Sequence, residues 1–248
     1  MISVCIATYN GEKYIREQIE SIITQIGAND EIVVSDNYSA DSTIGILESY
    51  NDNRIKILRF KKESRTAHEA VASNFENALN HCSGDYIFLS DQDDIWMEGK
   101  LKLMMEYLKE GYDLVTSDMA FMYNGKKDID NRPWRDKSPK GNWLITLPQY
   151  YGCCMAFNRK LLNVALPFPK HLPLHDGWLG ILGEMIGKTY HINIPLIYYR
   201  RNGNNVSGHS DNSLREKITY RMCFYYYIIV RTIHYYYRKF KSNSFLDK

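Results

Sequence analysis

The first half of the chain alternates between two spacings of apolar residues. Short runs rich in branched apolar side chains indicate buried strands at 2–8, 31–35, 54–60, 85–90 and 112–117. Between these runs, apolar residues recur every three or four positions, which predicts helices at 12–25, 41–50, 69–82 and 99–109. Strands that alternate with helices in this way are typical of an α/β fold with a mostly parallel central sheet.

The alternation breaks down after residue 118. Residues 124–140 are polar and contain Gly125, Pro133 and Pro139, which predicts a long loop. Beyond it we expect strands at 153–158, 189–193 and 196–200, and helices at 159–165 and 175–187. We therefore divide the chain into two halves of one domain, 1–118 and 119–212, followed by a tail at 213–248.

The tail has its own apolar period. One stripe is spaced three or four residues apart and consists of Leu214, Ile218, Met222, Tyr225, Ile229, Ile233, Tyr236 and Phe240. This spacing predicts an amphipathic helical extension. Residues 213–248 also carry eight Lys or Arg and two acids, a net charge of +6, whereas the remainder carries −4. An anionic membrane surface fits such a helix, and packing on the catalytic domain or a dimer seam are the alternatives.

Composition excludes several classes of protein. With 248 residues, of which 44% are hydrophobic and 24% charged, the chain is neither disordered nor a polytopic membrane protein. A net charge of +2 does not indicate a surface that coats nucleic acid. Five cysteines without a CxxC pair argue against a disulfide framework and a structural zinc site. The first ten residues lack the features of a signal peptide, so we expect a cytoplasmic protein.

Acidic side chains follow the predicted strands at the edge where a parallel sheet binds ligands. The run from Ser90 to Trp96 places Asp91, Asp93 and Asp94 directly after a buried strand. Repulsion among three carboxylates is costly unless a divalent cation neutralises it, so Mg²⁺ or Mn²⁺ is a candidate cofactor. The alternative is a solvated acidic turn that caps the helix starting near residue 99.

Two further positions are candidates for chemistry. Asp36, after the second strand, can accept a hydrogen bond from a nucleotide base or a ribose hydroxyl. Asp176, at the start of the helix at 175–187, can act as a general base or merely cap that helix. Dinucleotide-binding GxGxxG and hydrolase GxSxG motifs are both missing from the sequence.

These motifs together resemble a known family. The segments SVCIATYN (3–10), SDNYSAD (35–41), Asn74-Phe75 and above all GDYIFLSDQDDIW (84–96) are similar to family 2 glycosyltransferases of the GT-A fold. The SDQDDIW form resembles the subset that assembles bacterial surface polysaccharides such as O-antigen and capsule, including rhamnosyltransferases. The resemblance covers roughly residues 1–210.

The resemblance implies a role for each matching residue. Residues 1–118 would bind the nucleotide sugar, through Thr8, Tyr9, Asn10, Asp36, Asn37 and Asp91. Asp91 and Asp93 would form the DxD metal site. Residues 119–212 would bind the acceptor and supply Asp176 as the catalytic base. Arg200 and Arg201 are candidates for the diphosphate, because Asn202 stands where related sequences have a histidine that assists the metal or diphosphate.

The expected activity is an inverting, metal-dependent transfer of a sugar from a nucleotide diphosphate. The donor would be a UDP-hexose, a UDP-N-acetylhexosamine or dTDP-rhamnose, and the acceptor a hydroxyl of a saccharide or lipid-linked saccharide. The expected location is the inner face of the bacterial membrane, with no nucleic-acid partner and no indication of oligomeric state. Two alternatives remain open. A sugar-nucleotide nucleotidyltransferase would have a basic, glycine-rich loop after the first strand, and a non-catalytic binding module would not require Asp176.

Overall fold

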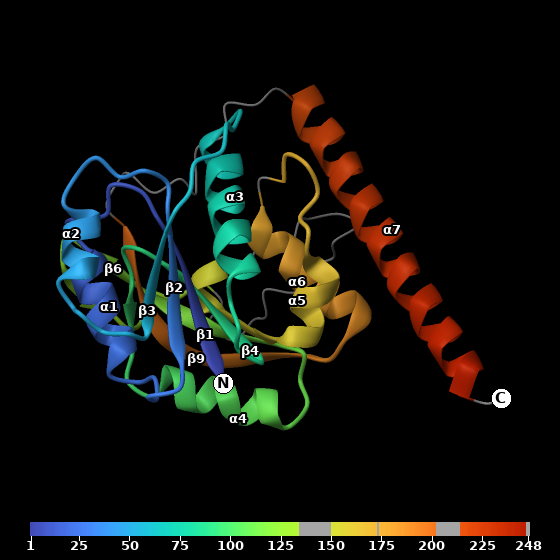
Figure 1. Ribbon diagram of the computed structural model, residues 1–248, viewed down its shortest axis with the longest axis horizontal. Coiled ribbons are helices and arrows are strands. Elements are labelled where there is room, and N and C mark those ends of the chain that lie inside the picture. Colours follow the sequence, from blue (N-terminus) through green and yellow to red (C-terminus); the bar gives the residue numbers. More distant parts are fainter. Residues whose placement is uncertain (134–149, 173, 202–213, 247–248) are drawn as a thin grey trace.

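The computed structural model describes residues 1–133, 150–172 and 174–201. It also describes the backbone of a C-terminal helix at 214–246, whose side chains are described from 221 to 242. These residues form a nine-stranded sheet with helices on both faces (Figure 1). The strands are β1 (Ile2–Thr8), β2 (Glu31–Asp36), β3 (Ile55–Arg59), β4 (Tyr86–Asp91), β5 (Ile95–Trp96), β6 (Leu114–Tyr123), β7 (Lys126–Asp128), β8 (Met155–Asn158) and β9 (Thr189–Arg201). The helices are α1 (Ile15–Ile23), α2 (Thr43–Glu48), α3 (Ala67–Asn80), α4 (Lys100–Lys109), α5 (Arg159–Ala165), α6 (His175–Ile186) and α7 (Leu214–Leu246), with a 3₁₀ turn η1 (Gly152–Cys154).

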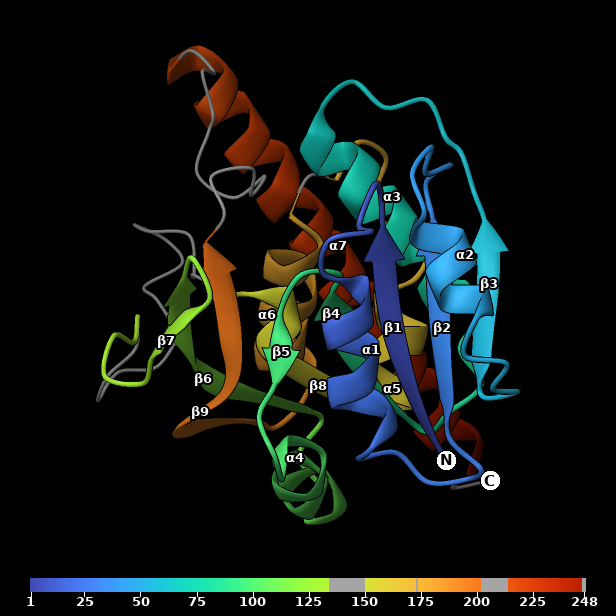
Figure 2. The ribbon, with the colours of Figure 1, turned by 90° about the vertical axis from the view of Figure 1, so that its left-hand side faces the viewer.

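The sheet has a parallel half and a mixed half. Its order is β3-β2-β1-β4-β8-β6-β9-β5, with β7 paired to β6. The first four strands in this order are parallel, as the alternation of strands and helices predicts. In the second half β6 and β9 are parallel, whereas β8, β5 and β7 run antiparallel to their neighbours (Figure 2).

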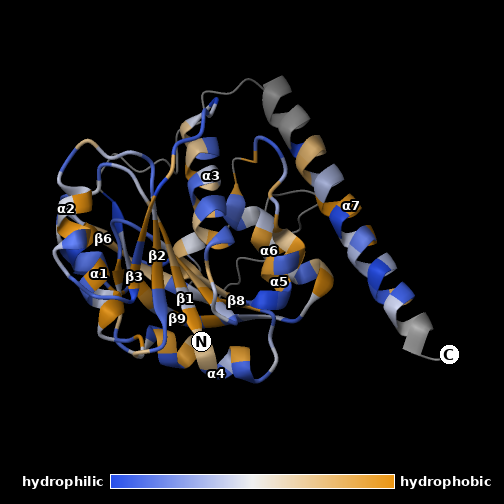
Figure 3. Ribbon diagram, viewed as in Figure 1, coloured by the Kyte–Doolittle hydropathy of each residue, from blue (hydrophilic) through white to orange (hydrophobic). Residues whose placement is uncertain are grey.

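Alternating side chains along the strands separate two apolar cores. Val4 and Ile6 of β1 face the layer formed by α1, α2 and α4, whereas Cys5 faces the layer formed by α3, α5 and α6. Both faces of the strands are therefore apolar, as expected for a parallel sheet covered on both sides. Figure 3 shows hydrophobic residues along the strands and also on the helices that cover them.

Three strands differ from the sequence-based expectation. β6 continues to Tyr123, past the predicted end at residue 117, because the side chain of Asp118 is fully buried beside Arg132, 3.5 Å away. Asp118 is thus within a strand and not at a strand end. The two strands expected at 189–193 and 196–200 are one strand, β9, with register shifts opposite Asp118. β7 forms a hairpin with β6 inside the predicted loop, and residues 134–140 of that loop lie outside the described residues.

The expected C-terminal helix is present as α7, and it packs outside α5 and α6. Among the described side chains of α7, Phe224, Ile228 and Thr232 are buried. The predicted stripe takes part in this contact only along one edge: Tyr225 packs partly buried against the same apolar core, and the hydroxyl of Tyr236 donates to the Met185 carbonyl oxygen of α6 at 3.0 Å. Ile229 and Ile233 of the stripe are exposed. No helix in the described part of the chain combines the length and apolar character needed to cross a bilayer.

Candidate active site

The carboxyl ends of three parallel strands meet at one edge of the sheet. In the strand register, Thr8 at the end of β1 pairs with Asp36 of β2, and the neighbouring Ala7 pairs with Asp91 of β4. The loops that follow these strands therefore leave the sheet side by side. An open α/β sheet binds its ligands at such an edge.

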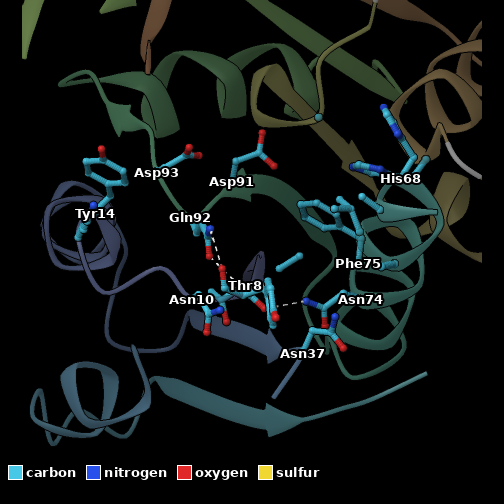
Figure 4. A pocket seen from close by; sticks show the side chains of 18 of the residues that line it. Thr8, Asn10, Tyr14, Asn37, His68, Asn74, Phe75, Asp91, Gln92 and Asp93 are labelled. Carbon is cyan, nitrogen blue, oxygen red and sulfur yellow. Dashed lines mark hydrogen bonds between the residues drawn. The ribbon is translucent and has the colours of Figure 1, made fainter. Parts of the chain in front are cut away.

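A cavity of about 980 Å³ opens above this edge. Its walls come from the loops after β1, β2 and β4, from α3, from the segment before η1 and from the first turn of α6 (Figure 4). The described residues that carry polar or aromatic groups in its wall include Thr8, Tyr9, Asn10, Tyr14, Asn37, His68, Asn74, Phe75, Asp91, Gln92, Asp93, Tyr151, His175 and Asp176. The cavity thus joins the two halves of the domain.

Most of the residues singled out in the sequence line this cavity. They are Thr8, Tyr9, Asn10, Asn37, Asp91, Asp93 and Asp176. Figure 4 shows the side chains of Asp91 and Asp93 on one wall, across the cavity from those of Asn10 and Asn37. Residues from β1 to α6, distant in the sequence, are therefore close enough to contact one ligand.

Three carboxylates in the cavity influence one another. Burial, together with the negative charges of Asp93 and Asp176, raises the pKa of Asp91 to about 7. Burial also raises the pKa of Asp176 to about 6, although backbone N–H groups of Gly177 and Gly152 oppose this shift. A site with repelling carboxylates and raised pKa values favours a bound cation or a proton.

Asp176 is not the N-cap of α6. Leu174 occupies the cap position, and Asp176 is the second residue of the helix, where its Oδ1 accepts the backbone N–H of Gly177 at 2.7 Å. The capping alternative is therefore wrong. The helix N-terminus and these N–H donors hold the carboxylate at the cavity wall, where it can accept a proton.

Asp36 lies behind the cavity wall and not in it. Its side chain is fully buried; Oδ1 accepts a hydrogen bond from Thr8 Oγ1 at 3.0 Å and Oδ2 accepts one from the Ser39 backbone at 2.9 Å. Arg59 lies 3.4 Å from the same carboxylate. As placed here, Asp36 orders the loop after β2, and Asn37 is the residue of that loop that reaches the cavity.

The two candidate diphosphate ligands are also engaged elsewhere. The guanidinium of Arg200 donates to the carbonyl oxygen of Asp93 at 2.8 Å and to Glu17 Oε2 at 2.6 Å, and it lies over the ring of Tyr14. Arg201 lies over the ring of Phe121. Neither arginine lines the cavity among the described residues. Arg200 instead holds the acidic loop from β9, and Asn202 lies outside the described residues.

Two sets of acids compete as a candidate metal site. Asp91, Asp94 and Cys153 can bring one ligand atom each within 4.8 Å of one another. However, Asp94 is fully buried and does not line the cavity, and a thiol is a soft ligand. Asp91 and Asp93 offer hard carboxylate oxygens directly to the cavity, which suits Mg²⁺ or Mn²⁺ bound together with a substrate phosphate. The residues present therefore fit a divalent cation at the DxD pair.

The alternative interpretation of the acidic run as a helix cap is wrong. The cap of α4 is Gly99, in a left-handed conformation with φ of 79°, and no side chain caps that helix. Asp94 Oδ1 instead accepts the backbone N–H of Arg200 at 3.0 Å. The run thus faces the cavity on one side and β9 on the other.

Sequence reasoning missed three supporting residues. Gln92 joins two loops, because its Oε1 accepts the Tyr9 backbone N–H at 2.8 Å while its Nε2 donates to the Tyr9 carbonyl at 3.2 Å. Asn74 Nδ2 donates to the Thr8 carbonyl at 3.1 Å. Lys100 is fully buried, donates to the Cys153 carbonyl and lies over the ring of Trp96. The only available signal was their presence within or beside the motifs.

Two curated relatives match most of the chain. It is 26% identical over 228 residues to Escherichia coli WfgD, a UDP-Glc:alpha-D-GlcNAc-diphosphoundecaprenol beta-1,3-glucosyltransferase, with 88% of this chain and 83% of that protein covered. It is also 26% identical over 215 residues to the dTDP-rhamnosyl transferase RfbG of Shigella flexneri, with 82% of this chain and 73% of that protein covered.

Solved structures of glycosyltransferases have the same fold. Residues 1–349 of Staphylococcus aureus TarS in complex with UDP-GlcNAc match with a TM-score of 0.67 at 22% identity, covering 93% of this chain and 66% of that chain. The mannosyltransferase PcManGT from Pyrobaculum calidifontis, in complex with GDP-Man and Mn²⁺, matches with a TM-score of 0.57 at 20% identity, covering 84% and 58%. This chain therefore spans about two thirds or less of the length of each of these structures. Their similarity confirms the expected GT-A fold.

The family expectation is tested independently by a family model. The model described as glycosyl transferase family 2 matches residues 3–165, which is more than half of the chain and includes the DxD pair. The fold, the cavity at the strand edge and the two relatives agree with that match. This chain therefore belongs to glycosyl transferase family 2.

Proposed function

We propose that this chain transfers a sugar from a nucleotide diphosphate to an acceptor hydroxyl with inversion at the anomeric carbon. The observation that supports this most strongly is the presence of Asp91, Asp93 and Asp176 in the wall of one cavity beside Thr8, Asn10 and Asn37. Thr8, Asn10 and Asn37 can donate or accept hydrogen bonds with a nucleoside, and the carboxylate of Asp176 can act as a general base.

The transfer is a single displacement. Asp176 accepts the proton of the acceptor hydroxyl while that oxygen forms a bond to the anomeric carbon. The bond from the anomeric carbon to the diphosphate breaks, and the diphosphate leaves with the electron pair. No general acid is required, because the nucleoside diphosphate is already a good leaving group.

Asp91 and Asp93 are the residues that would hold a divalent cation. When bound, Mg²⁺ or Mn²⁺ would supply positive charge that stabilises the leaving diphosphate. The residues of the chain fix the position of these carboxylates: Arg200 holds the Asp93 carbonyl, and Gln92 ties the loop to Tyr9. Both contacts order the site before substrate binds.

The proposed donor is a UDP-hexose, a UDP-N-acetylhexosamine or dTDP-rhamnose, and the proposed acceptor is a lipid-linked or polysaccharide hydroxyl in bacterial surface polysaccharide synthesis. WfgD supports the lipid-linked acceptor and RfbG supports the dTDP-rhamnose alternative. The proposed location is the inner face of the bacterial membrane, where both a lipid-linked acceptor and cytoplasmic sugar nucleotides are available. Residues 1–118 would hold the donor, and residues 119–212 the acceptor and the base.

The alternatives are less consistent with the site. A nucleotidyltransferase requires a basic, glycine-rich loop after β1, but here Tyr9 and Asn10 follow that strand and Glu12 and Lys13 offset one another in charge. A non-catalytic module has no need for Asp176 in the cavity.

The metal assignment is tested by removing one carboxylate. We expect Asp93→Ala to weaken UDP binding in the presence of Mn²⁺ by at least about tenfold, because one or two carboxylates normally hold such a cation against substrate phosphates. Calorimetric titration with UDP, with and without Mn²⁺, measures this. Glu98→Ala is the matched control, because Glu98 is an exposed acid nearby that does not line the cavity. Mn²⁺-dependent UDP binding that survives in Asp93→Ala would show that the DxD assignment is wrong.

A further inference from the structure

α7 has a packing face that attaches it firmly to the catalytic domain. Phe224 and Ile228 are buried, and Phe224 packs edge-on against Trp178 of α6 with 6.3 Å between ring centroids. The guanidinium of Arg231 donates to the carbonyl oxygens of Val164, Leu166 and Pro167, which follow or end α5. These contacts fix the orientation of the helix on the domain. The face of α7 that does not pack against α5 and α6 is therefore held in one orientation relative to the domain.

A different face of α7 carries an exposed apolar stripe. We define the exposed stripe as Met222, Tyr226, Ile229, Ile233, Tyr236 and Phe240, spaced alternately four and three residues apart. Their exposed fractions run from 47% to 75%. Tyr236 lies at the edge of this stripe nearest the domain, because its hydroxyl donates to the Met185 carbonyl oxygen at 3.0 Å. At about 100° per residue, the stripe is centred more than a quarter turn away from Ile228. Apolar patches of this kind on a soluble surface mark an interaction site.

The charge of the same segment is entirely positive. Residues 221–242 contain five Arg or Lys and no Asp or Glu. Arg238, Lys239 and Lys241 are exposed and flank Phe240, and tyrosines make up much of the remaining exposed surface. Exposed apolar side chains with tyrosines and a rim of cations are the composition of a helix that lies in the interface of an anionic bilayer.

The packing face connects the exposed stripe to the candidate base. A Cβ placed on Gly177 would lie 3.8 Å from Phe224 Cζ, so α7 contacts the first turn of α6, directly beside Asp176. Figure 1 shows α7 along the outer side of α5 and α6, away from the sheet. A surface that binds α7 therefore lies on the side of the molecule where α7 packs against the first turn of α6.

We propose that the exposed stripe of α7 binds the anionic surface of a bilayer and orients the first turn of α6, with Asp176, toward that surface. The orientation of the site toward a lipid-linked acceptor rests on the proposed function, whereas the binding of α7 to the bilayer does not. A second copy of the chain is less suitable as the occupant, because a symmetric pairing of two stripes would bring the cations of both helices together.

The test is co-sedimentation of the full chain with vesicles, without any sugar donor. The vesicles contain phosphatidylglycerol mixed with phosphatidylcholine, or phosphatidylcholine alone. We expect binding to the anionic vesicles that is at least tenfold tighter than to neutral ones and that weakens in high salt. The variant Met222→Ser/Ile233→Ser/Phe240→Ser should lose most of this binding while it keeps the unfolding temperature and UDP affinity of the wild type.

Two further variants make the result specific. Tyr123→Ser/Ile129→Ser/Ile194→Ser removes three exposed apolar side chains that lie outside α7, and should bind vesicles as the wild type does. Arg238→Gln/Lys239→Gln/Lys241→Gln should lose the preference for anionic lipid. The proposal is overturned if the wild type ignores anionic vesicles, if the stripe variant still binds them, or if the wild type is a dimer in solution that the stripe variant dissociates. Failure of glycosyl transfer would not change these outcomes, so the two proposals can fail separately.

Discussion

Asp176 combines partial access to the cavity with surroundings that penalise its charge. Its pKa is raised to about 6, chiefly by burial, whereas an ordinary aspartate has a pKa of about 4. A general base must be unprotonated. Since the folded-state pKa is raised, protonation removes the active form as the pH falls through about 6 and not through about 4.

We therefore expect kcat at saturating donor and Mn²⁺ to fall on the acid side with an apparent pKa near 6, and to approach tenfold per pH unit below it. A pH–rate profile from pH 4.5 to 8 measures this, and UDP binding over the same range separates titration of Asp91 from that of Asp176. A kcat that stays constant down to pH 5 would contradict this placement of the base.

At single positions, the sequence predicts the cavity well where the backbone determines the outcome. Thr8, Asn10 and Asp91 line the cavity because they end or follow parallel strands. The resemblance implies ligand contacts for Asp36 and Arg200, and the structure shows that both side chains hold loops of the cavity wall. Their orientation depends on partners distant in the sequence, such as Arg59 for Asp36 and Glu17 for Arg200, and no local pattern reveals those partners.

Helices and strands depend on close approaches that only the assembled fold shows. Gly180 in α6 faces Tyr150 so closely that an added Cβ would lie 2.2 Å from the Tyr150 ring. The ring is buried, so it cannot move aside freely. The closeness of this contact determines how α6, and Asp176 with it, sits against the segment before η1.

We expect Gly180→Ala to lower the free energy of unfolding by about 1–3 kcal/mol, as overpacking in a core typically does. Gly45→Ala in α2 is the matched control, because an added Cβ there meets nothing within 4 Å. That change should be neutral or stabilise the protein by up to about 1 kcal/mol through helix propensity. Chemical denaturation of both variants measures the difference. Equal stability of the two would contradict the close packing of α6 against Tyr150.

Among the elements, long amphipathic or apolar segments were predictable and short or interrupted ones were not. β1 to β4 and the helices between them follow the pattern, because their apolar residues recur at the spacing of a strand or a helix. β5 has only two residues and is defined by its pairing with β9, Ile95 opposite Tyr198. Pro195 made β9 look like two strands, although it lies at a register shift where a proline is tolerated.

At the scale of the whole molecule, the C-terminal helix α7 packs against α6, the helix that carries Asp176. The sequence predicts both the C-terminal helix and its apolar stripe, and the stripe residues described here are mostly exposed. The second apolar face, Phe224 and Ile228, is not predictable from the sequence, because two apolar residues four positions apart form too short a pattern. The helix consequently packs on the domain with one face and exposes apolar side chains on another. From the sequence alone, packing on the domain and binding to a surface are alternatives that exclude one another.

The central claim is that Asp176 accepts the proton in a glycosyl transfer from a nucleotide sugar. The most direct measurement is the rate of transfer to a lipid-linked saccharide by the wild type and by Asp176→Asn, with UDP-glucose, UDP-N-acetylglucosamine and dTDP-rhamnose as donors in the presence of Mn²⁺. The account predicts that the wild type uses at least one donor and forms a product of inverted configuration. It also predicts that Asp176→Asn is slower by about 10²–10⁴-fold with nearly unchanged UDP affinity. Wild-type turnover by Asp176→Asn, a product of retained configuration, or no transfer from any of these donors would contradict it.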